Sequence, residues 1–141
     1  MKKSEIEELG LTENKDVDKL FKERQDERVK LIKESITDIQ EMIKDRKELH
    51  DEMIDNLSKI DLFIDNTMPK LDALQSGTNP AKSDLLKELM KKKIEIDELK
   101  LAEKLNFWRD KALLKKELRE HMKEYREMES KTSMLDTLLE M

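Results

Sequence analysis

Two basic side chains interrupt an apolar helical stripe and are the first candidates for chemistry in this sequence. Arg46 and His50 lie in the segment KDRKELHDEM, residues 44–53, and the stripe is apolar before and after them. A buried guanidinium or imidazole needs an acidic or hydrogen-bonding partner, because an unpaired charge inside a protein is costly. The two side chains therefore predict a polar layer whose partners lie elsewhere in the chain.

Those partners are expected on a second helical stripe, which turns polar at Glu103, Asn106 and Asp110. If the chain folds back at its one loop-like segment, residues whose numbers sum to about 156 lie opposite each other. Arg46 then lies near Asp110, and His50 lies near Asn106. Such a layer selects the register of two helices more than it stabilises them. Two alternatives remain open: the Arg46 side chain reaches solvent along the helix surface, or it contacts a second chain.

Catalytic, metal and cofactor chemistry find little support in the sequence. A di-metal carboxylate bundle uses Glu-x-x-His pairs, and neither His50 nor His121 has a Glu three residues before it. The two glycines stand far apart, so there is no glycine-rich phosphate loop. A thin helical bundle also offers few concave pockets. We therefore expect no catalytic, cofactor-binding or metal-ligating residues, and we predict that the protein is not an enzyme.

The composition indicates long helices. Charged residues make up 45% and apolar residues 36% of the 141 residues, with only two glycines and two prolines. Strands and tight turns need β-branched, aromatic and glycine-rich stretches, whereas sequences rich in Glu, Lys and Leu with a helical period form coiled coils. Disordered chains lack such periodic apolar residues. One all-α domain is therefore expected.

Charge and apolar run length limit the expected partners and location. The net charge is −5 with both signs mixed along the chain, whereas a nucleic-acid binder usually presents a basic face. No apolar run approaches the roughly 20 residues of a membrane span, and the opening MKKSEIEELG lacks the apolar core of a signal peptide. We expect no nucleic-acid partner, no membrane span, and an intracellular, cytoplasmic protein.

The first long helical arm is expected over residues 14–75. Its stripe alternates spacings of three and four residues, and 11 of its 14 positions are apolar, which indicates a left-handed coiled coil. Pro69 predicts a kink near residues 66–69. A connecting loop follows at residues 76–83, where Pro80 suits a first helical position. The stripe consists of Val29, Ile32, Ile36, Ile39, Ile43, Arg46, His50, Met53, Leu57, Ile60, Ile64, Thr67, Leu71 and Leu74.

The second long helical arm is expected over residues 84–141. A separate C-terminal helix that begins at about residue 131 is an alternative for its last part. The arm carries three overlapping stripes, so more than one face is apolar and the helix should touch more than one neighbour. The first stripe is Leu85, Leu89, Lys92, Ile96, Leu99, Glu103, Asn106, Asp110 and Leu113. The second is Leu101, Leu105, Trp108 and Ala112. The third is Phe107, Leu114, Leu118, His121, Tyr125, Met128, Thr132, Leu135 and Leu139.

Eight apolar residues are predicted to contact a partner protein. Residues 1–13 read as a short helix that either docks on a partner or folds back on the body. The C-terminal LDTLL, residues 135–139, has the Leu-x-x-Leu-Leu form of helices that bind in grooves. Phe107 and Trp108 point about 100° apart, so one can pack in the core while the other contacts a partner. The predicted contact set is Ile6, Leu9, Leu11, Phe107, Trp108, Leu135, Leu138 and Leu139.

These patterns predict an all-α protein, an elongated antiparallel helical hairpin or coiled-coil bundle that is completed by self-association or by a partner. Two helices alone cannot bury every apolar stripe. The expected function is a non-enzymatic structural or adaptor subunit that assembles protein complexes through apolar helix faces, as a homo-oligomer or a subunit of a hetero-complex with helical protein partners. The alternative is a chaperone-like or inhibitory protein that binds a client reversibly through its terminal helices.

Overall fold

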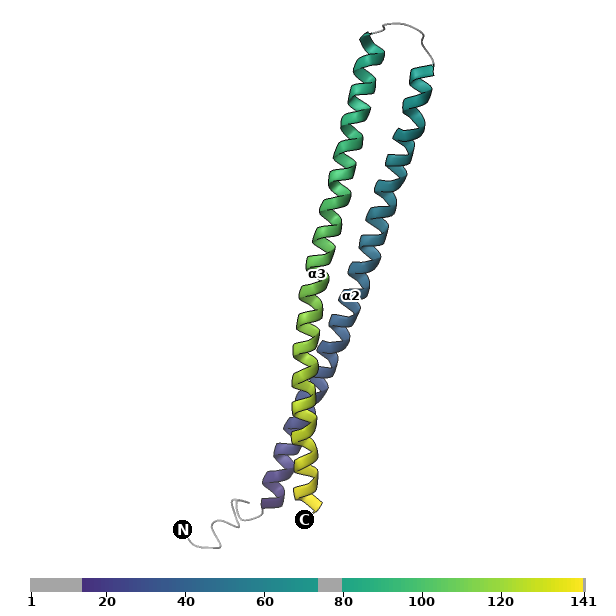
Figure 1. Cartoon of the computed structure of the whole chain (residues 1–141). Coiled ribbons are helices and arrows are strands. Elements are labelled where there is room, and N and C mark those ends of the chain that lie inside the picture. Colours follow the sequence, from purple (N-terminus) through teal and green to yellow (C-terminus); the bar gives the residue numbers. More distant parts are fainter. Residues whose placement is uncertain (1–13, 74–79, 141) are drawn as a thin grey trace. The chain divides into compact units, whose positions relative to one another are not determined.

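The described residues form two long α-helices (Figure 1), and these helices pack against each other. The computed structural model describes residues 14–73 and 80–140, and all of them are helical. Helix α2 spans Asn14–Ala73 and helix α3 spans Pro80–Glu140. The prediction of an all-α helical hairpin is confirmed. The predicted N-terminal segment, with Ile6, Leu9 and Leu11, lies outside the described residues.

Helix α2 continues through its proline and ends at Ala73. Pro69 has no N–H to donate to the carbonyl of Asp65, so the helix lacks one backbone hydrogen bond there. Packing on both sides of the proline compensates, since Ile64 is buried and Leu71 is half-buried. The Lys82 ammonium of α3 then donates to the Asp72 carbonyl at 3.0 Å, and this satisfies one of the carbonyls that a helix leaves open at its end.

Helix α3 begins at Pro80 and continues without a break past residue 131. The segment around Ser130 to Ser133, where a separate helix could have begun, is helical throughout. Hydroxyl side chains in this part bond within the helix: Thr132 donates to the Met128 carbonyl and Thr137 to the Ser133 carbonyl, both at 3.0 Å. Bonds to the carbonyl four residues earlier are compatible with helical geometry, so these residues do not interrupt it.

The described residues form two compact units, and each unit pairs one stretch of α2 with one stretch of α3. Unit 1 comprises residues 14–42 and 114–140, and unit 2 comprises residues 43–73 and 80–113. Within each unit the two stretches are antiparallel, because higher residue numbers in α2 pair with lower numbers in α3. Unit 1 shows this in Lys22–Asp136 and Lys33–Tyr125, and unit 2 in Arg46–Asp110 and Lys93–Asp65.

The buried core of each unit is small. Ile32 and Ile39 are the buried apolar side chains of unit 1, and Ile64 and Ile96 are those of unit 2, among the described residues. A helix that faces a single neighbour can shield only one stripe, so the other stripes stay exposed. Over the described residues, no helix combines the length and apolar character that crossing a bilayer requires.

The shielded stripe of α2 departs from the predicted seven-residue repeat after His50. Met53 and Ile60, which were expected to face inward, are exposed. Ile54 and Asp61 are half-buried and occupy the inward positions. The strict repeat was therefore the wrong period for this part of α2, since one residue of displacement turns a side chain by about 100°.

Helix α3 shows a matching irregularity at the same height of unit 2. Eleven-residue repeats have about 3.67 residues per turn, closer to a straight helix than the 3.5 of a heptad coiled coil. In α2 the shielded positions with spacings of three, four and four are Ile43, Arg46, His50 and Ile54. In α3 the positions with the same spacings are Lys100, Glu103, Phe107 and Lys111. We infer that both helices relax their supercoil where the long polar side chains meet.

The three predicted stripes of α3 divide by exposure. The third stripe, from Phe107 to Leu139, is half-buried at every position. The first stripe is mixed: its exposed members are Leu85, Lys92, Leu99, Asn106 and Leu113, and the shielded ones are Leu89, Ile96, Glu103 and Asp110. The second stripe is exposed at all four positions. Every second member of the first stripe thus lies on the seam, and the second stripe lies away from it.

Candidate functional site

A polar layer lies near one end of unit 2, close to Ile43 and Leu113, and Arg46 connects its two acids. Arg46 Nη1 donates to Glu103 Oε1 at 2.7 Å, and Arg46 Nε donates to Asp110 Oδ2 at 3.1 Å. The side chains of Arg46 and Glu103 are only 16% and 7% exposed, whereas that of Asp110 is 39% exposed. The Arg46–Glu103 pair is therefore the buried part of the layer, and Asp110 closes it on the solvent side.

His50 joins the layer through the same carboxylate oxygen. Its Nδ1 lies 3.1 Å from Glu103 Oε1, and an ionised carboxylate can only accept, so Nδ1 carries the proton in this contact. The imidazole stacks on the ring of Phe107, with 4.1 Å between the ring centroids and 13° between the planes. Cationic groups of Arg46 and Lys111 lie 5.4 and 5.6 Å from the same ring centroid. Phe107 therefore covers the layer with an aromatic face that attracts cations.

The layer favours the charged form of its acid and its base. The hydrogen bond from Arg46 lowers the pKa of Glu103, burial works against this shift, and the hydrogen bond from His50 adds to it. The hydrogen bond to Glu103 raises the pKa of Arg46. The pair therefore stays ionised near neutral pH, and Glu103 remains an acceptor.

The arrangement contains a carboxylate–imidazole pair, but it lacks the third part of a nucleophilic site. In hydrolases such a pair orients a histidine toward a hydroxyl or thiol. The hydrogen-bond and ring partners of His50 among the described residues are the Glu103 carboxylate and the Phe107 ring, and neither is a hydroxyl or a thiol. The chemistry of this cluster is charge pairing inside a helical seam.

Asn106 does not belong to this layer, and the prediction for it is corrected. It is exposed, and its Oδ1 accepts a hydrogen bond from Arg109 at 3.2 Å on the same helix. Glu103 occupies the place opposite His50 instead. Glu103 precedes Asn106 by three residues, nearly one helical turn, and its longer side chain reaches His50 and also pairs with Arg46.

Two further ion pairs of the unit 2 seam were not predicted. Lys100 Nζ lies 3.3 Å from Asp61 Oδ2, and both side chains are about one-fifth exposed. Lys93 and Asp65 form a second, more exposed pair. These residues were missed because the predicted stripes placed the residue before each of them on the seam instead. The residue numbers sum to 158 for Lys93 and Asp65, close to the predicted 156, but to 161 for Lys100 and Asp61, so only the first pair could have been found by counting from the fold-back.

The predicted aromatic pair separates as its 100° offset requires. Phe107 lies on the seam, in contact with the polar layer. Trp108 is 79% exposed. Phe107 is therefore a core residue, which corrects its prediction as a partner contact, whereas Trp108 is available to a partner.

The C-terminal part of the predicted contact set divides in the same way. Leu135 and Leu139 are half-buried on the shielded stripe of α3 in unit 1, and Leu138 is exposed. Lys22 of α2 pairs with Asp136 in this stretch, and the hydrogen bond to the Asp136 carboxylate raises the pKa of Lys22. Leu135 and Leu139 thus serve the intramolecular seam, which corrects their prediction, and Leu138 faces outward.

An apolar face of α3 in unit 2 has no neighbour from α2. We call it the outer face, and it consists of Ile94, Leu101, Leu105, Trp108 and Ala112. Its spacings of seven, four, three and four residues keep these side chains on one side of the helix. Ile94, Leu101 and Leu105 are each more than half exposed. These apolar groups are gathered on one face rather than scattered singly, which makes the outer face a candidate interaction surface.

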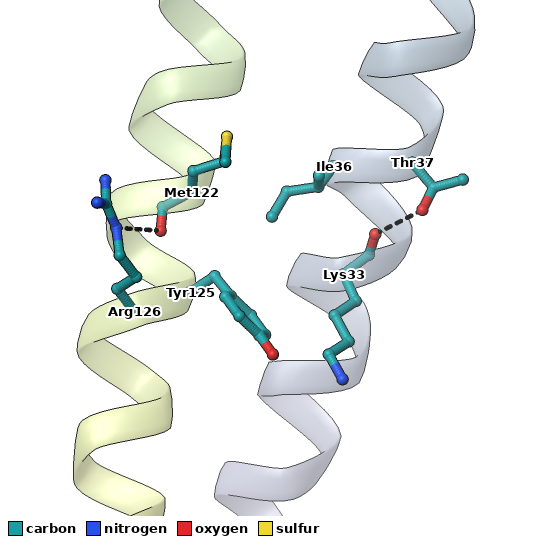
Figure 2. A pocket seen from close by; sticks show the side chains of 6 residues that line it. All are labelled: Lys33, Ile36, Thr37, Met122, Tyr125 and Arg126. Carbon is teal, nitrogen blue, oxygen red and sulfur yellow. Dashed lines mark hydrogen bonds between the residues drawn. The ribbon is translucent and has the colours of Figure 1, made fainter.

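A shallow groove lies in unit 1, and Figure 2 shows the six side chains that line it. Ile36 and Met122 provide apolar walls, and Lys33 Nζ lies 5.5 Å from the centroid of the Tyr125 ring. Arg126 Nε donates to the Met122 carbonyl at 3.3 Å. The lining, which also includes Thr37, holds two cations and no carboxylate. This lining is compatible with an apolar side chain that stands next to an acidic one.

Metal chemistry has no donor cluster in the part of the chain that the structure describes. Across residues 14–73 and 80–140, no three His, Cys, Asp or Glu side chains converge as ligands of one ion. His121 lies 3.8 Å from Glu117 and 3.7 Å from Glu124, both on its own helix. These are surface pairs at helical spacing.

A family model described as "Family of unknown function (DUF8104)" matches residues 6–139. The match covers both described helices almost completely. Neither a curated protein nor a solved structure matches the chain.

Proposed function

The chain belongs to the family DUF8104, and from its exposed helix faces we propose that it is a non-enzymatic structural or adaptor subunit. In this role it assembles a protein complex through helix-on-helix packing. Its partners are helical proteins, and its place of action is the interior of the cell.

The outer face of α3 is the observation that carries this proposal. Trp108 is 79% exposed although it stands between apolar residues of the same stripe. Trp is enriched at the centres of protein interfaces, where its large apolar surface becomes covered. An exposed side chain of this size, on a helix whose opposite face is already used by α2, supports binding to a further helix.

The polar layer supports the same proposal by a different route. An adaptor must present its outer face at a fixed position relative to the rest of unit 2. A slip of α2 against α3 would leave Glu103 without Arg46 and His50, and such an unpaired buried acid is costly. The layer therefore defines one register of the unit, as polar residues do in other coiled coils.

Site-specific crosslinking tests the proposal. A photoreactive amino acid replaces Leu105 in the full chain, in cells that produce the protein, and a control chain carries it at Glu88, an exposed α3 position outside the face. We expect covalent attachment to a polypeptide from position 105 and not from position 88. Equal yields of crosslinked product from both positions would refute an interaction through the outer face.

The exposed C-terminal residues of unit 1 favour one rival, a reversible client-binding protein. Met134 and Leu138 are both exposed and stand four residues apart on α3, so they share a side of the helix. This rival requires ends that open easily in the free protein. Hydrogen exchange at residues 134–141 distinguishes the two: strong protection without any partner would contradict the rival.

A further inference from the structure

We propose that the partner of the outer face is a second copy of this chain, bound antiparallel through Leu101, Leu105 and Trp108. The inference rests on the proposed function and names the occupant of its surface. The contact is formed by α3 alone, because the outer face points away from α2 within unit 2.

The position of the face follows from helical geometry. The seam with α2 contains Lys100 and Phe107, which pair with Asp61 and stack on His50, respectively. At about 100° per residue, Leu101 and Trp108 lie one step around the helix from those two residues. Leu105 lies about 160° from Phe107. A helix that binds Leu105 therefore approaches from the side opposite to α2.

The charges beside the face change sign along it. Asp97 and Glu98 stand near its N-terminal end, and Lys104 and Arg109 stand near its C-terminal end. Asp97 and Lys104 are seven residues apart, so they lie on one flank within about 20° of each other. Glu98 and Arg109 are eleven residues apart and share the other flank within a similar angle. Each flank thus carries an acid at one end and a base at the other.

An antiparallel pair of copies pairs the charges of the flank that carries Glu98 and Arg109. A two-fold axis that relates antiparallel helices brings the same flank of each copy together. When Leu101 faces Leu105 of the second copy, Glu98 lies within one residue in height of Arg109 of the second copy. The symmetry repeats this contact, so the pair forms twice. A parallel pair in register would instead bring opposite flanks together and place Glu98 near Asp97 of the second copy, and like charges across an interface oppose binding.

The size of the face predicts a weak dimer. The stretch from Ile94 to Ala112 is about 27 Å long at 1.5 Å per residue. Two such stripes bury roughly 1,000 Å² in total, which is the lower end of specific interfaces. We therefore expect a dissociation constant in the micromolar range, with a monomer of 16.8 kDa at low concentration.

Charge reversal tests the arrangement with the full chain. Molar mass is measured by light scattering from about 10 µM to about 1 mM, for the wild type, Glu98→Arg, Arg109→Glu, both together, and the control Glu88→Arg. Each single reversal places two pairs of like charges in the dimer, so we expect about tenfold or greater weakening. The double variant should recover association, and so should an equimolar mixture of the two single variants. Circular dichroism checks that helix content is unchanged, since all three positions are exposed.

The outcomes separate this inference from the proposed function. A dimer that Glu98→Arg and Glu88→Arg weaken equally would overturn the outer face as the self-contact. A chain that stays monomeric at about 1 mM, yet crosslinks from position 105 to a different polypeptide, would overturn the second copy and leave the adaptor role standing. A monomer without such crosslinks would overturn both.

Discussion

Breaking the Arg46–Glu103 pair gives the sharpest test of the polar layer. Arg46→Met keeps the apolar stem of the side chain and removes the guanidinium. The bond to Glu103, 2.7 Å long and nearly buried, contributes about 1.5–3 kcal/mol as a charged hydrogen bond. The more exposed contact with Asp110 adds at most about 1 kcal/mol, and the contact with the Phe107 ring adds about 0.5 kcal/mol. We expect the free energy of unfolding to fall by about 3 kcal/mol.

The double variant shows whether the cost comes from an orphaned charge or from lost packing. Glu103→Leu alone leaves Arg46 with Asp110 and should lower the free energy of unfolding by about 2 kcal/mol. Arg46→Met together with Glu103→Leu removes both charges, and well-packed apolar replacements of buried ion pairs are often neutral or stabilising. The two single costs should therefore not add, and their difference from the double variant measures the coupling.

Urea unfolding followed by far-ultraviolet circular dichroism measures these differences, and hydrogen exchange of unit 2 amides locates them. Lys59→Met is the matched control, because Lys59 pairs with Asp55 at 3.0 Å on a surface where both side chains are more than 60% exposed. That variant should barely move the unfolding midpoint. A loss under about 0.5 kcal/mol for Arg46→Met, or fully additive costs in the double variant, would refute the buried layer.

Three other predictions follow from contacts in unit 2. The pKa of Glu103 lies below its ordinary 4.5 in the folded chain, so the unfolded state binds more protons between the two pKa values. The free energy of unfolding should therefore fall as the pH drops through and below about 4.5, and the unfolding midpoint of Glu103→Gln should depend less on acid pH. Phe107→Ala removes the stack on His50 and should cost about 2–3 kcal/mol, whereas Trp108→Ala, at a side chain 79% exposed, should leave thermal unfolding nearly unchanged. Asp61 Oδ1 is buried without a hydrogen-bond partner in the described part of the chain. The double variant Asp61→Leu with Lys100→Leu should therefore match or exceed the wild type in urea unfolding, while Lys100→Leu alone should lower the free energy of unfolding by about 1–2 kcal/mol. A double variant less stable than the single one would contradict this.

The pattern of the sequence was sufficient for the secondary structure and for the antiparallel pairing. Apolar residues at spacings of three and four, with few glycines and prolines, indicate helices whatever their neighbours. Counting from an expected fold-back near residue 78 placed Arg46 beside Asp110, and the two side chains do form a hydrogen bond. Residues 80–83, which were predicted as part of the connecting loop, belong to α3 instead. Local periodicity and chain length suffice for such a conclusion.

Only the packed helices decided which residue of each neighbouring pair faces inward. Ile54 rather than Met53, Glu103 rather than Asn106, and Phe107 rather than Trp108 lie on the seam. Each choice is a rotation of about 100° or less, and in this chain both orientations present a plausible side chain. The rotation of each helix depends on how the two helices, with their matching eleven-residue segments, pack against each other. The sequence of one helix does not specify the rotation of the other. The helices and their order were therefore determined by the sequence itself, and the seam, the composition of the polar layer and the exposure of Trp108 were determined by the packing of α2 against α3 within unit 2.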